Sequence, residues 1–300
     1  MPSMLPGRGD DLDYEVVDVF TDTAYTGNPL AVVLGADELG TAALQGIARE
    51  FNLSETAFPM RPSAAERDAG ADYRLRIFTP AVELPFAGHP SLGAAWVLAR
   101  RGELARGPVV QACGAGLLAL DVADDRVELT GGTPSVGPER DAAGLLAGVG
   151  LEAADLAGVV RDASCGLGFT FLPVVPDALA RLAVDLPSLQ RLGLGAGGSF
   201  GGLSVVAWDG ERARCRVLAF EAGVAEDPAT GSAALGLGAW LVASGLVPAE
   251  GETPYEVVQG VEMGRPSRLS CVVRAHAGTA VQVRVSGQLV AVASGRLRRP

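Results

Sequence analysis

The sequence predicts an α+β fold that consists of two similar halves, and three observations lead to this prediction. Many short segments are apolar or alternate between polar and apolar residues, which is typical of strands, whereas few segments have helical spacing. Two apolar segments that begin at Gly88 and Gly231 resemble each other and lie 143 residues apart. The chain has 300 residues, about twice the length of an average domain.

In the first half, apolar segments between turn residues predict strands, and apolar residues along one face predict a helix. The expected elements are strands at residues 16–20, 30–34 and 73–78 and a helix at 41–51. Residues 79–90 contain three prolines and form a rigid connection into a helix at 91–101. That helix ends at Gly102, which acts as its C-terminal cap. Three strands follow between residues 109 and 130.

The second half begins with residues 131–157, which are rich in Gly, Pro, Ala and acidic residues and indicate a crossover between domains. A helix is expected within residues 174–192. A rigid loop at 221–231 precedes an apolar helix at 232–244, which is closed by Gly245. Strands are expected at residues 203–208, 213–219, 257–261, 268–275, 281–286 and 289–293.

The two similar helices are apolar on nearly all faces, which indicates that each is buried inside its own half. Each half is therefore expected to wrap a mostly antiparallel sheet or barrel around a central helix. The first turn of a helix has unpaired N–H groups and a partial positive charge. Two such helix starts facing one cleft would hold a small carboxylate without help from Lys or Arg.

The composition excludes several classes of function. The chain has 24 basic and 35 acidic residues, and all 24 are Arg because it contains no Lys. This rules out a Schiff-base lysine and a Walker A lysine. The net charge of −11 argues against nucleic-acid and membrane partners. Two His residues are too few for a His-rich metal site, and the four widely spaced Cys are expected to be free thiols.

The N-terminus has no apolar signal region, and the longest apolar stretch has 11 residues, which is too short to span a bilayer. We therefore expect a soluble, cytoplasmic protein with a disordered tail at residues 1–11. Two short motifs indicate other functions, a G-x-G-x-x-G at 193–198 and a G-x-S-x-G at 197–201. Dinucleotide-binding and hydrolase motifs both need a following helix, but a strand is expected there.

Five segments together resemble the phenazine-biosynthesis isomerase (PhzF-like) family, a branch of the diaminopimelate epimerase fold. They are VDVFTDTAYTGNPLAVVL (17–34), EFNLSETAF (50–58), RIFTPAVELPFAGHPSLGAAWVL (76–98), EDPATGSAALGLGAWLV (226–242) and QGVEMGRPS (259–267). The resemblance implies two pseudosymmetric halves, an active-site cleft between them, a homodimer and no cofactor. It also implies that the end of the chain returns to the first half. We therefore expect residues 12–130 and 287–300 to form the first half and 131–286 the second.

The resemblance also implies roles for individual residues. The acid of N-L-S-E-T, the family's proton-transferring base, is Glu55 here, and the histidine of G-H-P is His89. The aspartate and serine of E-D-P-A-T-G-S are Asp227 and Ser232. Glu55, His89 and Asp227 are thus the expected catalytic residues, and no residue is expected to bind a metal. The residues expected to bind substrate are Ser54, Gly88, Gly231 and Ser232.

Four further positions bear on the site, and two of them restrict the type of reaction. Related racemases carry a Cys before the glycine at each helix start, but Ala87 and Thr230 stand there in this chain, which argues against a two-thiol racemase. Asn28 and Pro29 are interpreted as turn residues, although they lie near the cleft in the resembling family.

The sequence therefore predicts a cofactor-independent isomerase that removes a proton from a small carboxylate-bearing substrate and returns it elsewhere. The alternative is a non-catalytic protein that binds small carboxylates, or an interaction protein, that has kept the cleft.

Overall fold

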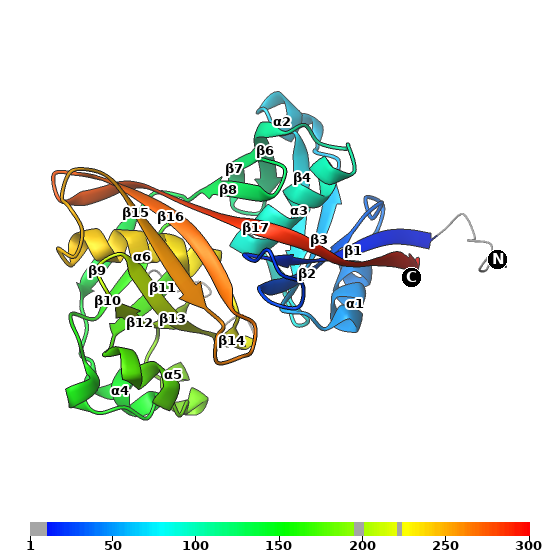
Figure 1. Cartoon of the computed structure of the whole chain (residues 1–300). Helices are drawn as coiled ribbons and strands as arrows, with labels where there is room; N and C mark the ends of the chain where they lie inside the picture. The colour runs from blue at the N-terminus through cyan, green and yellow to red at the C-terminus, as the bar shows by residue number, and fades with distance from the viewer. Residues whose placement is uncertain (1–10, 195–200, 221–223) are drawn as a thin grey trace.

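A computed structural model describes residues 11–194, 201–220 and 224–300. Figure 1 shows two lobes side by side, each with one long helix enclosed by strands. Most of the expected tail (1–11), of the two glycine motifs (193–201) and the start of the loop expected at 221–231 lie outside the described residues. Among the described residues, no helix combines the length and the apolar character needed to cross a membrane.

The strands of the first half form a closed ring around the central helix α3 (Gly88–Arg100). In ring order they are β1 (Asp11–Val19), β2 (Asn28–Val33), β3 (Glu55–Met60), β4 (Tyr73–Phe78), β6 (Gly107–Cys113), β7 (Gly116–Val122), β8 (Arg126–Thr130) and part of β17 (Thr279–Arg298). The short strand β5 (Glu83–Leu84) pairs with β4, and α1 (Thr41–Phe51) and α2 (Ala64–Asp68) are the other helices of this half.

The second half repeats this plan around α6 (Gly231–Ala243). Its strands are β9 (Ser135–Glu139), β10 (Arg161–Ser164), β11 (Gly168–Pro173), β12 (Gly202–Trp208), β13 (Arg212–Ala219), β14 (Val224–Asp227), β15 (Gly251–Gln259), β16 (Ser267–His276) and the start of β17. Short helices α4 (Ala143–Gly148), η1 (Ala153–Asp155), η2 (Pro176–Arg181) and α5 (Leu186–Gln190) also belong to this half.

The strand directions repeat as well. In the first half, β1–β2 is antiparallel, β2–β3 parallel, β3–β4 antiparallel and β4–β6 parallel. The second half shows the same series in β10–β11, β11–β12, β12–β13 and β13–β15. Residues Gly88–Leu98 of α3 and Gly231–Val242 of α6 are all buried. The predicted α+β fold of two pseudosymmetric halves around buried helices is therefore confirmed.

One long strand joins the two halves. β17 pairs first with β16, then with β8, and from Leu289 onward with β1, so it runs from one lobe into the other (Figure 1). The sequence analysis expects two separate strands here, at residues 281–286 and 289–293. In the structure Gly287 makes room for Phe20, since a Cβ at this position would lie 2.3 Å from Phe20 Cδ1.

Other elements differ from the sequence prediction where local residues mislead. β1 begins at Asp11 rather than at the expected residue 16, because Asp11, Asp13 and Glu15 make its first part look like a polar tail although Leu12 and Glu15 are buried. The expected crossover contains β9 and α4, β14 lies within the expected rigid loop, and β10 and β11 were not predicted. Both central helices begin earlier than expected, at Gly88 and Gly231. Gly102 and Gly245 have φ of 75° and 66°, which confirms them as helix caps.

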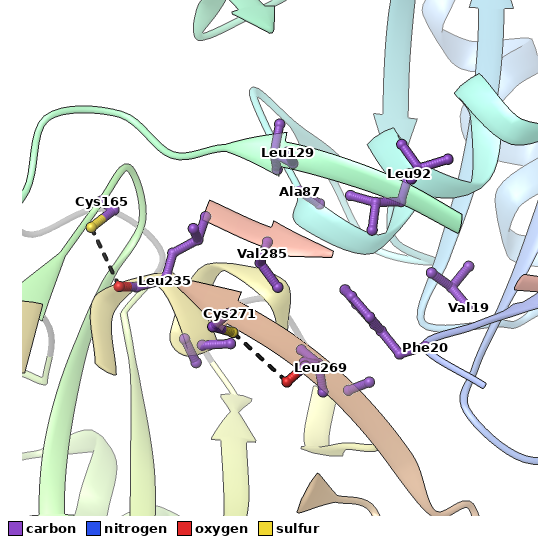
Figure 2. Close-up of a cluster of buried hydrophobic side chains, with 14 of the residues drawn as sticks. Val19, Phe20, Ala87, Leu92, Leu129, Cys165, Leu235, Leu269, Cys271 and Val285 are labelled. Atoms are coloured by element: carbon purple, nitrogen blue, oxygen red, sulfur yellow. Dashed lines mark hydrogen bonds between the residues drawn. The ribbon is translucent and has the colours of Figure 1, made fainter. Parts of the chain in front are cut away.

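A continuous apolar core passes from one half into the other. Figure 2 shows Val19, Phe20 and Leu92 of the first half beside Leu269 and Val285 of the second. All four cysteines are free, as predicted, and all four are buried. Because interiors are close-packed, this shared core fixes how the starts of the two central helices face each other.

Candidate active site

A small, partly enclosed cavity of about 40 Å³ lies where the starts of α3 and α6 meet. Its polar lining comes from both halves: Glu55, His89, Asp227, Thr230 and Ser232, with the backbone of Gly88 and Gly231. Its apolar lining is Leu84, Ala87, Leu167, Phe169, Ala219 and Val224. The structure therefore brings together residues that are up to 177 positions apart in the sequence.

The two helix starts touch through glycine. A Cβ on Gly88 would lie 3.2 Å from Gly231 Cα and 3.3 Å from the Ser232 nitrogen, so any side chain here would push the helices apart. Neither N-cap residue, Ala87 nor Thr230, makes a side-chain hydrogen bond to its helix. The first-turn N–H groups of both helices thus remain available to a bound anion.

Glu55 and His89 form the first buried pair of the site. Glu55 is the first residue of β3, and its side chain is 11% exposed. Its Oε2 lies 3.5 Å from Nε2 of His89, which sits in the first turn of α3 and is 4% exposed. Neither atom has a hydrogen-bond partner among the described residues. A bound substrate could use both.

Asn28, at the start of β2, links the two halves. Its Nδ2 donates to Asp227 Oδ1 and to the Ala229 carbonyl, both at 2.8 Å. The same nitrogen lies 3.3 Å from Nδ1 of His89. When the amide donates to Nδ1, the proton of the neutral imidazole is on Nε2, which faces Glu55. Burial lowers the pKa of His89 to about 3, so the ring is neutral.

Asp227 is the second acid of the site, at the end of β14. Its Oδ2 accepts a hydrogen bond from the Thr230 hydroxyl at 2.5 Å. The Gln259 amide donates to the Asp227 carbonyl at 2.7 Å and to Thr230 Oγ1 at 3.0 Å. Burial raises the pKa of Asp227 to about 6, although the bonds from Thr230 and Asn28 oppose this effect.

The two acids affect each other. Burial, and in addition the charge of Asp227, raise the pKa of Glu55 well above its ordinary value. Among the described residues that line the cavity there is no Arg, and the chain contains no Lys. Negative charge in the cavity is therefore balanced by helix ends and by protons rather than by a cation.

The acid residues do not follow the pseudosymmetry. Glu55 is the first residue of β3, and the first residue of the equivalent strand β12 is Gly202. The residues that follow them, Thr56 and Leu203, pair with the ends of the equivalent strands β4 and β13, which agrees with this assignment. The offset of 143 residues that relates the central helices places Leu84 opposite Asp227. Each acid thus has an uncharged counterpart, and the apolar side of the cavity includes Leu84.

The structure changes the interpretation of two residues. Asn28, which the sequence analysis treats as a turn residue, is fully buried and connects Asp227 to His89. Two sequence signals could have indicated this role: its polar side chain begins an apolar strand, and the family resemblance places it near the cleft. Ser54, expected to bind substrate, precedes Glu55 but is not among the described residues that line the cavity. Gly88, Gly231 and Ser232 do line it.

The chain is similar in sequence to one protein family and to named isomerases. The family model PhzC-PhzF, described as phenazine biosynthesis-like protein, is similar to residues 17–295. The trans-2,3-dihydro-3-hydroxyanthranilate isomerase of Pseudomonas fluorescens is 34% identical over 289 residues, which cover 95% of this chain and 99% of the relative. The enzyme of the same name from Pseudomonas aeruginosa is 35% identical over 291 residues, which cover 94% and 98%.

Solved structures give a consistent result. A predicted epimerase from Pseudomonas aeruginosa superposes with a TM-score of 0.77 at 34% identity, covering 95% of this chain and 99% of that one. A PhzF-family protein from Bacillus anthracis has a TM-score of 0.83 at 24% identity, covering 96% and 99%. A hydroxyproline epimerase from Agrobacterium vitis shares the fold, with a TM-score of 0.64 at 15% identity over 97% and 93% of the two chains.

Proposed function

From the premise that the chain belongs to the phenazine biosynthesis-like (PhzC-PhzF) family and is an isomerase, we propose a specific reaction. The protein moves a proton between two carbons of a small carboxylate, without a cofactor. The observation that carries the proposal is the contact between Glu55 and His89. Two buried, unpartnered polar atoms lie 3.5 Å apart beside two open helix starts. Such an arrangement can transfer a proton and stabilise the charge that develops.

The proposed reaction balances within one substrate. The Glu55 carboxylate accepts a proton from carbon, and the electron pair of the broken C–H bond moves into the adjacent unsaturated system. The protonated Glu55 then donates its proton to a second carbon, where a new C–H bond forms. We assign both steps to Glu55, because its equivalent is Gly202 and the oxygens of the other acid, Asp227, already accept hydrogen bonds from Asn28 and Thr230. The proton therefore leaves and returns on the same face of the substrate.

The neighbouring groups support this transfer. Burial makes an ionised Glu55 a stronger base than a solvated carboxylate. The neutral His89 offers an N–H at Nε2 to a substrate oxygen or to Glu55, and Asn28 holds the ring in that orientation. The helix starts at Gly88 and Gly231 bind the substrate carboxylate. Asp227 accepts a hydrogen bond from an amino or hydroxyl group of the substrate.

The names of the Pseudomonas relatives supply a first test compound, trans-2,3-dihydro-3-hydroxyanthranilate, which has a carboxylate, an amino group and a hydroxyl. We would incubate it with the purified chain in D₂O and in H₂O and follow the mixture by proton NMR. An isomer with a C–H bond at a new carbon is the expected product. Saturable binding without an isomer, and without deuterium in the recovered compound, would instead support the non-catalytic carboxylate-binding protein.

The family resemblance further leads us to propose a homodimer. Light scattering on the purified protein should then give twice the mass of one chain. A monomer at micromolar concentration would contradict this part of the proposal but not the proposed reaction, because the described residues of one chain already bring Glu55, His89 and Asp227 together.

A further inference from the structure

We propose that Arg265, which does not line the cavity, is a positioning residue that holds the loop before Asn28 and so places the Asn28 amide between Asp227 and His89. The inference rests on the proposed function, because it assigns a role within the same site. Arg265 lies in the second half, between β15 and β16, whereas Asn28 belongs to the first half. The residue therefore acts across the boundary between the halves.

The Arg265 guanidinium forms several hydrogen bonds with the loop at residues 20–27 and with Asp18. Its Nε donates to the Gly27 carbonyl and its terminal nitrogen to the Thr26 carbonyl, both at 2.8 Å. The same terminal nitrogen binds Asp18 Oδ1 at 2.5 Å, and Asp18 Oδ2 accepts the Tyr25 N–H at 2.6 Å. Asp18 is only 2% exposed, so its charge needs this partner.

The loop also has hydrogen bonds of its own among Thr21, Thr23 and Thr26, and the Gly27 N–H donates to the Pro266 carbonyl at 3.1 Å, but its backbone conformation is unusual. Phe20, Tyr25 and Gly27 have φ near 70°, a region that side-chain-bearing residues rarely adopt. A Cβ on Gly27 would lie 2.5 Å from the Val19 carbonyl oxygen, so the turn is tight. The Tyr25 side chain is 73% exposed and contributes little packing. A planar group that binds two carbonyls and a carboxylate together is well suited to keep such a loop in one conformation.

The segment that carries Arg265 also contacts the other side of the site. The Gln259 amide donates to the Asp227 carbonyl, and the backbone N–H of Arg265 donates to the Gly260 carbonyl. Gly260 packs against Pro228, since a Cβ there would lie 2.6 Å from the Pro228 carbonyl oxygen. One turn, residues 259–266, therefore fixes both Asp227 and the loop that ends at Asn28.

The position of the Asn28 amide matters because more acceptors surround its nitrogen than it has hydrogens to donate. Nδ2 carries two hydrogens but has three acceptors within 3.3 Å, on Asp227, Ala229 and His89. A small displacement of the loop would change which of these bonds form. Loss of the bond to Asp227 removes a donor that favours its ionised form, so its pKa would rise further.

The experiment compares Arg265→Lys with Asn28→Ala, the double variant and a control, Arg268→Ala. Lysine keeps a positive charge near Asp18 but lacks the fork that binds the carbonyls. Arg268 lies three residues away with an exposed side chain. Two readouts are used: isomerisation of trans-2,3-dihydro-3-hydroxyanthranilate, and binding of 2-aminobenzoate as a function of pH. The second does not require turnover, because an aromatic ring cannot isomerise.

We expect Arg265→Lys to lower kcat by about tenfold, with a smaller change in KM, as is typical of a displaced catalytic group. The pH at which 2-aminobenzoate affinity falls should move upward by about one unit, a tenfold change in the ionisation constant of Asp227. In the Asn28→Ala background the Lys substitution should add less than a twofold effect on either readout, because both act through one amide. Arg268→Ala should match the wild type.

Two results would overturn the proposal. In the first, the effects of Arg265→Lys and Asn28→Ala multiply, which means that Arg265 acts independently of the amide. In the second, Arg265→Lys lowers the melting temperature while the pH midpoint of binding stays fixed, which is a structural role only. An inactive wild type that still binds 2-aminobenzoate would reject the proposed reaction, and the binding readout would still decide the role of Arg265.

Discussion

Asp227→Asn should make the protein more stable at neutral pH, because the wild-type fold buries a carboxyl group that is ionised there. Burial raises the pKa of Asp227 from its ordinary value of 3.8 to about 6. Between these two pH values the folded chain holds the proton more tightly than the unfolded chain. The free energy of unfolding therefore falls as pH rises from about 4 to about 6 and is constant above that range.

The magnitude follows from the two pKa values. Each pH unit between them is worth about 1.36 kcal/mol, so the full loss of stability is about 3 kcal/mol. Roughly half of this loss occurs between pH 5 and pH 7.5. The full loss of about 3 kcal/mol is a large share of the free energy of unfolding of an ordinary domain, which is about 5–15 kcal/mol. The pKa of Glu55 is raised as well, so Glu55→Gln should change the stability in the same direction.

The assay is urea unfolding followed by tryptophan fluorescence, since Trp240 is 1% exposed and reports the core of the second half. The difference in unfolding free energy between Asp227→Asn and the wild type should grow by about 1 kcal/mol from pH 5 to pH 7.5, in favour of the variant. Asp68→Asn, at an exposed position in α2, serves as control and should show no such growth. Parallel curves for Asp227→Asn and the wild type would refute the burial argument.

Two more substitutions test the carboxylate site. Gly88→Ala should weaken 2-aminobenzoate binding by about tenfold in a fluorescence titration, because the added methyl group would press on Gly231 and separate the helix starts. The control is Gly40→Ala, whose added methyl group meets open space. Equal affinities of the Gly88→Ala variant and the wild type would contradict the prediction. In the wild type, affinity for 2-aminobenzoate should fall as pH rises through about 6, where Asp227 ionises. Thr230→Val removes a donor to Asp227, so this fall should move to higher pH, and an unchanged midpoint would count against the assigned hydrogen bond.

Elements with a strong local pattern could be predicted from the sequence. The two central helices are apolar on all faces and end at glycines, so their existence and burial follow from residues within each segment. The similarity of the two segments, which lie 143 residues apart, also revealed the two halves. β1 and β10 were missed in part or in whole because charged residues such as Asp11 and Arg161 lie on them, and their pairing partners are distant in the sequence.

The site was predicted unevenly for a related reason. Glu55, His89 and Asp227 were named from motifs that resemble a family, not from local physics, which alone would treat Glu55 as a solvated acid. Asn28 could not be recognised because its role depends on Asp227, which lies 199 residues away. The same holds for Arg265, whose partner Asp18 is 247 residues away. Such contacts exist only once the halves are packed together.

The proposal that Glu55 transfers the proton is tested most directly by Glu55→Gln. Glutamine preserves the shape of the side chain but cannot accept and return a proton as a carboxylate does. The measurement is the rate of isomer formation from trans-2,3-dihydro-3-hydroxyanthranilate at saturating substrate, with 2-aminobenzoate binding as the check that the site is intact. We expect affinity at least equal to that of the wild type and a rate lower by about 10²-fold or more. A variant that binds normally and isomerises within a fewfold of the wild-type rate would show that Glu55 is not the base.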